Sequence, residues 1–293
     1  MGTTHIGTGE TKSAKTKTTT ARVLSYIFLG FVTLISLFPL YLLLINSTRS
    51  HLEINAGFSM LPSLNLSLNF QKAAAGGGLW TGLLNSFIVA TASSLLSCYF
   101  SAMTAYGIHV YDFKLKKFAF TFIMVIMMIP TQISAVGFVE LVYKFGLDNT
   151  FLPLIVPSIA APAVFFYMKQ YVESSLPLEV IEAARVDGSN EFRTFNTIAL
   201  PMMKPAIAVQ LIFAFTSSWN NFFIPALILN KPENKTVPIL ISTLRTNVAS
   251  GGASADWGMV YMTILIAIIP VVIVYIFVSK HIVQGVALGA VKG

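Results

Sequence analysis

The residues whose types could do catalytic or metal chemistry are few and widely spaced. The single cysteine is Cys98, and the four histidines are His5, His51, His109 and His281. A metal site needs several such ligands at short spacing, so the sequence predicts neither a metal site nor a catalytic cluster. No GxxxxGK[ST] phosphate-binding loop occurs, which indicates that this chain does not hydrolyse ATP by that route.

One strongly charged stretch between apolar runs has the spacing of a helical hairpin. Pro177 suits a first helical turn, where its missing N–H would lack a partner anyway, and Ser174 or Ser175 can cap that turn. Gly188 can adopt the left-handed conformation that ends a helix. Ser189 can then cap a second short helix. The sequence therefore predicts a helix, a glycine elbow and a second helix.

The surface of this predicted hairpin mixes small residues with charges. Ala183 and Ala184 would let another protein approach closely, while Glu182, Arg185 and Asp187 offer charges that can be oriented. A solvated loop is the alternative interpretation, because most charge runs are solvated. Two capped helices with apolar residues between the charges favour docking of a cytoplasmic protein instead.

Long apolar segments must position this hairpin. Hydrophobic residues make up 55% of the 293 residues and charged residues 11%, whereas soluble domains carry about 25% charged residues. Runs of about 20 apolar residues can cross a bilayer as helices. Six such runs occur, at 23–45, 79–108, 118–139, 151–168, 205–229 and 257–278. The sequence predicts an all-α membrane protein with six transmembrane helices.

The distribution of Lys and Arg predicts the orientation of these spans. The N-terminal tail, the loop after the second span, the hairpin segment and the C-terminal end together carry 13 of them, and the opposite loops carry six. The side richer in Lys and Arg is cytoplasmic, so both termini are expected inside the cell. The same bias accounts for the net charge of +7, and no basic face with interleaved aromatic residues points to nucleic acid.

At the hairpin the sequence resembles a known family. The EAA motif of permease subunits from bacterial and archaeal ABC importers is matched at every fixed position and spacing by Glu182-Ala183-Ala184, Gly188, Ile198 and Leu200-Pro201. The tail at 289–293 looks like that of maltose-type carbohydrate permeases, and the run 219–222 before Pro225 is also similar to that class. The resemblance covers the chain from about residue 23 onward.

The resemblance implies the type I ABC importer permease fold and a place in the cell (plasma or inner) membrane. Glu182 would pair with a basic residue of a separate ATPase subunit, Ala183 and Ala184 would pack at the contact, and Gly188 would form the elbow. Arg185 and Asp187 complete this expected coupling set. The domains expected are a cytoplasmic tail at 1–22, a permease domain at 23–280 that includes the coupling segment 173–204, and a cytoplasmic tail at 281–293.

The partners implied are a homologous second permease chain, two ATPase subunits, an extracellular solute-binding protein and membrane lipid. ATP and Mg²⁺ would be bound by the ATPase subunits, and this chain itself would bind no cofactor and catalyse no reaction. The tail at 289–293 would also contact the ATPase. The expected function is import of a carbohydrate, such as an oligosaccharide, by alternating access. The alternatives are import of a non-sugar solute, an ATP-independent facilitator or channel, and a membrane-embedded enzyme, which would need a catalytic cluster.

Hydrogen-bonding side chains at membrane depth are the candidates for contact with the solute. Thr131 and Gln132 follow Pro130, and Asn220 and Asn221 follow Trp219. Amides and hydroxyls within a membrane also hold helices together, so each of the four has this second interpretation. The polar residues of the second span are expected to serve helix packing; they are Asn85, Ser86, Ser93, Ser94 and Ser97.

Overall fold

The computed structural model describes residues 10–76, 78–252 and 256–290, and it describes side chains from Arg22 to Phe277. All regular elements among these residues are helices, as the composition predicts. The chain divides into two compact units, one made of residues 1–70 and 256–265 and the other of residues 71–255 and 266–293.

The helices vary from single turns to more than thirty residues. In chain order they are α1 (Glu10–Ser47), α2 (His51–Asn55), α3 (Leu66–Ala75), α4 (Leu79–Val110), α5 (Lys116–Met127), α6 (Thr131–Lys144), α7 (Leu152–Ile155), η1 (Val156–Ile159), α8 (Pro162–Ser175), α9 (Leu178–Val186), α10 (Glu191–Thr194), the π-helix η2 (Phe195–Ala199), α11 (Leu200–Met202), α12 (Lys204–Trp219), α13 (Phe223–Ile228), η3 (Pro232–Asn234), α14 (Val237–Ala249) and α15 (Trp257–Ala290).

In the first unit, the end of α1 is held by a buried arginine and a buried asparagine. The Arg49 guanidinium donates to the Asn46 side-chain oxygen at 3.1 Å and to the Gly57 carbonyl at 2.9 Å. The Asn69 amide donates to the carbonyls of Ser47 and Arg49 at 2.8 and 2.9 Å. The bond to Ser47 satisfies a carbonyl that the end of α1 leaves without a partner, and the others fix the chain that follows α1.

A glycine lets the start of α15 approach this corner of the first unit. A Cβ atom on Gly258 would lie 2.5 Å from the Asn69 side-chain oxygen and 2.7 Å from the Arg49 carbonyl oxygen. Both distances are far below a normal van der Waals contact, so only glycine fits here.

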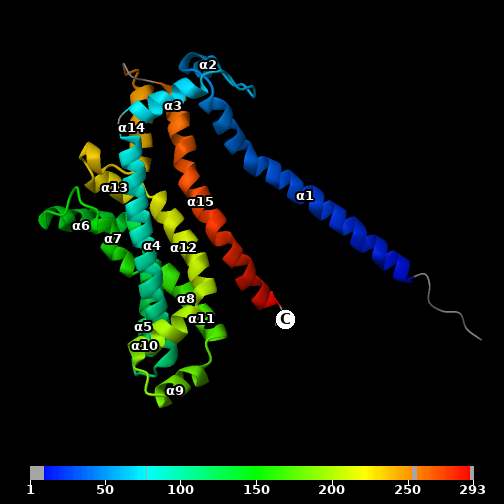
Figure 1. The fold of residues 1–293 in the computed structure, drawn as a ribbon, viewed down its shortest axis with the longest axis vertical. Coiled ribbons are helices and arrows are strands. Elements are labelled where there is room, and N and C mark those ends of the chain that lie inside the picture. Colours follow the sequence, from blue (N-terminus) through cyan, green and yellow to red (C-terminus); the bar gives the residue numbers. More distant parts are fainter. Residues whose placement is uncertain (1–9, 77, 253–255, 291–293) are drawn as a thin grey trace, which may run out of the picture. The chain divides into compact units, whose positions relative to one another are not determined.

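In the second unit, α4 is the central helix, and α8 and α12 run beside it (Figure 1). Small residues on α4 make the close packing possible, because alanine and serine let helix backbones approach within a membrane. Ala90, Ala102 and Ala105 are almost fully buried there. Ser93 donates to the Leu154 carbonyl at 3.2 Å, and Ser101 donates to the Ala161 carbonyl at 3.4 Å. Hydroxyls of α4 thus satisfy carbonyls at the break between α7, η1 and α8.

The polar residues at the start of α4 hold the loop before α14. The Asn85 amide donates to the carbonyls of Glu233 and Lys235 at 2.8 and 3.0 Å. The Ser86 hydroxyl accepts from the Val237 N–H at 2.9 Å. Together with the Ser93 contact, these bonds confirm the packing role for Asn85, Ser86 and Ser93. The hydroxyls of Ser94 and Ser97 instead donate to carbonyls within α4.

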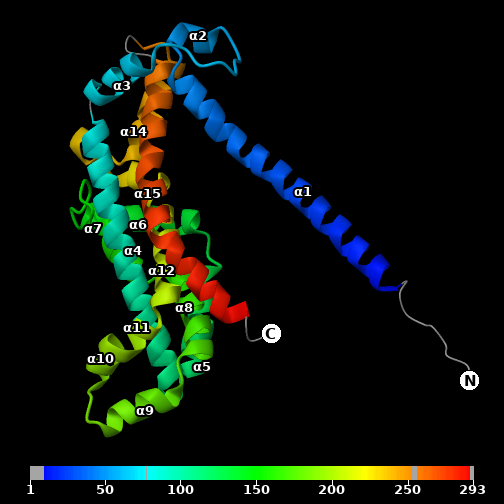
Figure 2. The ribbon, with the colours of Figure 1, turned by 45° about the vertical axis from the view of Figure 1, so that its right-hand side comes forward.

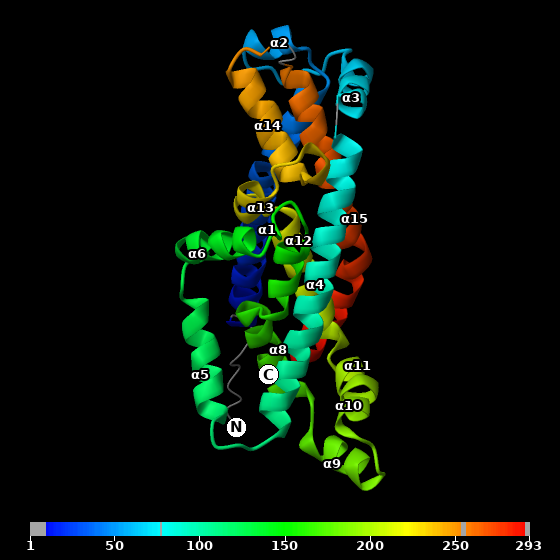
Figure 3. The same cartoon turned by 90° about the vertical axis from the view of Figure 1, so that its left-hand side faces the viewer.

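The six predicted spans correspond to five long apolar segments and one bent pair among the described residues. The five segments are Arg22–Ser47, Leu79–Val110, Leu152–Ser175, Lys204–Ile228 and Trp257–Phe277. The third span, expected at 118–139, is instead α5 followed by α6 at an angle of 93° (Figure 3). Pro130 stands at this bend with φ −62° and ψ 128°, and its missing N–H cannot continue the helix.

Candidate coupling and solute-contact sites

The glycine elbow predicted at Gly188 is present. Gly188 has φ +79°, a conformation that costs other residues about 1–2 kcal/mol. The Ser189 N–H donates to the Ala184 carbonyl and the Gly188 N–H to the Arg185 carbonyl, both at 3.0 Å. This pair of bonds is the Schellman arrangement that ends a helix. The elbow therefore ends α9 and turns the chain into α10, beyond the end of α4 (Figure 2).

The predicted caps of the hairpin differ from those that form. Pro177, in extended conformation, precedes α9 as its N-cap residue, and the Ser174 hydroxyl donates to the Tyr171 carbonyl within α8. The cap of α10 is Asn190, whose side-chain oxygen accepts from the Arg193 N–H at 2.9 Å. Ser189, the residue expected to cap, instead accepts a hydrogen bond from the Thr194 hydroxyl at 2.9 Å. The N-cap of α10 therefore lies one residue later than predicted, and its side chain satisfies the N–H of the third helical residue.

The inner face of the hairpin segment is buried in the second unit. Ile181 and Ala184 of α9 are 1% and 6% exposed. Thr194, Phe195 and Ala199 are buried as well, and the Tyr99 hydroxyl of α4 donates to the Asn196 side-chain oxygen at 3.2 Å. These contacts hold the hairpin against the end of α4 instead of leaving it as a solvated loop.

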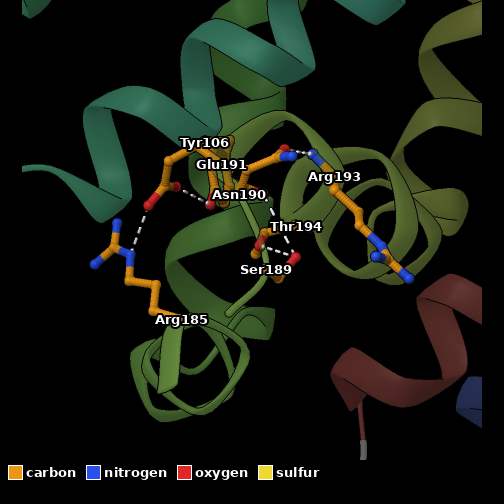
Figure 4. A network of polar contacts seen from close by, with 7 residues as sticks. All are labelled: Tyr106, Arg185, Ser189, Asn190, Glu191, Arg193 and Thr194. Carbon is orange, nitrogen blue, oxygen red and sulfur yellow. Dashed lines mark hydrogen bonds and ion pairs between the residues drawn. The ribbon is translucent and has the colours of Figure 1, made fainter. Parts of the chain in front are cut away.

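Glu191 joins α9, α10 and α4 through one carboxylate (Figure 4). Its Oε1 atom accepts from Arg185 Nε at 2.7 Å, and its Oε2 atom accepts from the Tyr106 hydroxyl at 3.1 Å. The Arg185 guanidinium also lies over the ring of Tyr111, 5.4 Å from its centre. We call Tyr106, Tyr111, Arg185 and Glu191 the brace. The brace connects the hairpin to α4, since Tyr106 lies 85 positions before Glu191 in the chain.

Electrostatics favours the ionised form of the brace. The hydrogen bond from Arg185 is the largest cause that lowers the pKa of the Glu191 carboxyl, and the bond from Tyr106 lowers it further. The same bond to Glu191 raises the pKa of Arg185. Burial first, and then the nearby Glu191 carboxylate, raises the pKa of the Tyr111 hydroxyl. The carboxylate and guanidinium therefore remain charged together at neutral pH.

The outer face of the hairpin is exposed and carries most of the predicted coupling residues. Glu182, Ala183, Arg185 and Asp187 are exposed, whereas Ala184 is buried among the inner contacts. Two apolar side chains stand out on this face, Val186 at 88% and Phe192 at 68% exposure. Ala184 therefore packs inside the permease itself, and the alanine free to meet a partner is Ala183.

The four predicted solute-contact residues do not gather at one place. Thr131 lines a cavity of about 690 Å³ between α4, α5, α6 and the start of α8. Gln132 is exposed beside it on α6. Asn220 and Asn221 are exposed at the break between α12 and α13, where their N–H groups bond to the carbonyls of the last turn of α12.

A second cavity of about 760 Å³ lies between α4, α8 and α12. Its lining contains Gln210, which was not predicted as a site residue, and the serine hydroxyls of Ser93 in α4, Ser158 in η1 and Ser217 in α12. A glutamine inside an otherwise apolar run is the signal that could have identified it. The predicted contact of the tail at 289–293 lies outside the residues whose side chains the structure describes.

Residues 99–287, which include α8, the hairpin and α12, match a family model described as "Binding-protein-dependent transport system inner membrane component". The chain belongs to this family. With several helices long and apolar enough to cross a bilayer, this inner membrane component is a multi-pass membrane protein and a transport subunit.

This inner membrane component is similar to named transport proteins of two bacteria. It is 34% identical to the arabinooligosaccharides transport system permease protein of Halalkalibacterium halodurans, over 94% of this chain and 100% of that protein. It is 29% identical to the sn-glycerol-3-phosphate transport system permease protein of Agrobacterium fabrum, over 90% and 95% of the two chains.

A solved structure shares the fold. A chain of a bacterial ABC transporter involved in the import of the acidic polysaccharide alginate is similar with a TM-score of 0.74 and 20% identity, covering 94% of this chain and 99% of that one. This likeness confirms the permease fold that the family resemblance implies.

Proposed function

We propose that this permease carries a carbohydrate into the cell by alternating access, driven by two separate ATPase subunits that bind ATP and Mg²⁺. A homologous second permease would complete the pathway, and an extracellular binding protein would deliver the solute. The names of the relatives support a carbohydrate or a related polyol phosphate as the solute class.

The observation that carries the coupling role is the two-sided construction of the hairpin. Its inner face is buried against α4 and fixed by the brace. Its outer face presents Glu182, Ala183 and Val186 to solvent. ATP can shift a conformational equilibrium only through contacts that differ between the two states. A rigid hairpin with a free outer face provides such a contact and passes its displacement to a span.

Charge reversal at Glu182 tests this role. We expect Glu182→Lys to place a cation against the basic residue proposed on the ATPase, because like charges at a contact repel. The expected result is at least a tenfold loss of ATPase that co-purifies with the tagged permease, together with loss of solute-stimulated ATP hydrolysis. Insertion of the permease into the membrane should be unchanged.

Glu233→Lys is the matched control, since Glu233 is exposed in η3, at the opposite end of α4 from the hairpin. It should retain the ATPase. Normal recovery of ATPase and normal uptake with Glu182→Lys would contradict the coupling role.

A further inference from the structure

A largely buried glutamine of α12 lines the cavity between α4, α8 and α12. Gln210 of α12 is 6% exposed, and its side chain makes no hydrogen bond to any described residue. The side-chain nitrogen and oxygen of Gln210 are not among the fully enclosed polar atoms that lack a partner, so the amide reaches the space of the cavity. Gln210 lines the cavity, so its amide is available to an occupant.

The rest of the cavity has the chemistry of a site for sugar hydroxyls. The 760 Å³ volume lies within the usual range for small-molecule pockets. Ser217 and Ser218 follow Gln210 after about two turns of α12, so their hydroxyls lie along the same wall. Two aromatic rings stand at the cavity, Tyr167 from α8 at 57% exposure and Phe213 from α12 at 64%. Apolar C–H faces of a sugar can pack on such rings while its hydroxyls meet the amide and serines.

The lining also lacks charge. No Lys, Arg, Asp or Glu is among the described residues that line this cavity. A phosphate or carboxylate group taken into an apolar cavity would need a paired cation to offset its desolvation. A neutral hydroxyl needs only partners that donate and accept, and a glutamine amide does both.

We propose that this cavity is a transient contact site for a neutral polyhydroxylated solute, with Gln210 as its central hydrogen-bonding residue. The proposal rests on the proposed function, and it narrows the solute class to uncharged oligosaccharides. The hydroxyl of Ser217 supplies a second contact on the same wall. Phosphorylated and uronic-acid solutes are excluded from this site by its lack of cations.

The test measures solute carried per ATP hydrolysed in proteoliposomes that contain the complete complex, its binding protein and ATP. Arabinotriose, sn-glycerol 3-phosphate and an alginate trisaccharide serve as labelled solutes. We expect transport of arabinotriose alone. Gln210→Leu should lower the arabinotriose-to-ATP ratio roughly tenfold, because a lost hydrogen bond to a buried group has about this effect. The rate of ATP hydrolysis and the recovery of all subunits should stay within twofold.

Two further variants sharpen the test. Ser217→Ala should lower the same ratio by a smaller factor, roughly two- to fivefold. Gln170→Leu is the matched control, because Gln170 is an exposed glutamine of α8 that does not line the cavity, and it should leave the ratio unchanged.

Three outcomes would overturn the inference. If Gln210→Leu leaves the ratio of solute carried to ATP hydrolysed unchanged, Gln210 does not contact the solute. Uptake driven by ATP in the same variant would still support the proposed function. Loss of the second permease from the Gln210→Leu complex makes Gln210 a residue of the subunit contact. Transport of only the phosphate or the uronate solute contradicts the neutral solute class.

Discussion

At the scale of single residues, Glu191 matters more than its exposure suggests. The side chains of Arg185 and Glu191 are 37% and 43% exposed, and isolated ion pairs of this kind stabilise proteins by about 1 kcal/mol or less. The geometry gives the pair another role, because the same carboxylate also holds Tyr106 of α4. Its effect should therefore appear in transmission from hairpin to span more than in folding.

Neutralising Glu191 tests this distinction. Glu191→Gln keeps the size of the side chain but removes the charge that Arg185 and Tyr106 share. We expect the melting temperature of the complex to change little, and solute import per ATP to fall several-fold because the hairpin is less firmly joined to α4. Glu179→Gln, on the same hairpin but outside the brace, should change neither quantity. A large drop in melting temperature with unchanged import per ATP would instead make Glu191 a structural residue.

The pKa shift of Glu191 also sets a pH window. Its pKa lies below the ordinary value of 4.5 because of the bond from Arg185. The stabilising contribution of a carboxyl with a lowered pKa is fully present above the ordinary value and is lost as the pH falls through the lowered one. Glu191 should therefore stay ionised between about pH 5.5 and pH 8. We expect import per ATP to depend on pH in the same way over this range in the wild type and in Glu191→Gln.

At the scale of elements, the elbow of the hairpin needs glycine because of the backbone conformation of Gly188, and not because a side chain would lack space. A Cβ atom on Gly188 would meet no atom within 4 Å, so a side chain there would cause strain only through its φ of +79°. We expect Gly188→Val to displace the end of α9, because a β-branched residue rarely adopts this conformation. The expected result is at least a fivefold loss of co-purified ATPase.

Gly188→Asn is the control for this prediction, because asparagine tolerates the left-handed region better than other residues. It should retain most of the ATPase. Equal recovery with both variants would show that the elbow does not position the docking face.

At the scale of the whole molecule, the second unit has the length that a membrane requires. Asn85 holds the loop before α14 at one end of α4, and Tyr106 holds the hairpin at the other. The 21 positions between them correspond to roughly 32 Å of helix, which matches a hydrocarbon core of about 30 Å. The loop near Lys231 and the hairpin should therefore lie on opposite sides of the membrane.

Cysteine labelling can test the orientation. Cys98 is buried and is the single native cysteine, so a Cys98→Ser background is practical. In intact cells, a membrane-impermeant maleimide should label Lys231→Cys. It should label Lys117→Cys only after the cells are permeabilised, since the side richer in Lys and Arg is cytoplasmic. The reverse pattern would contradict the cytoplasmic placement of the hairpin.

The sequence by itself determined the membrane class, the positions of the spans and the glycine elbow. Apolar length follows from composition alone, and the left-handed turn at Gly188 is a local property of the backbone. The tertiary structure decided the rest. It buried Ala184 on the inner face and brought Glu191 to Tyr106. It also placed the side chain of Gln210 at a cavity between three helical segments. These features arise from contacts between distant segments, and neither periodicity nor motif spacing contains that information.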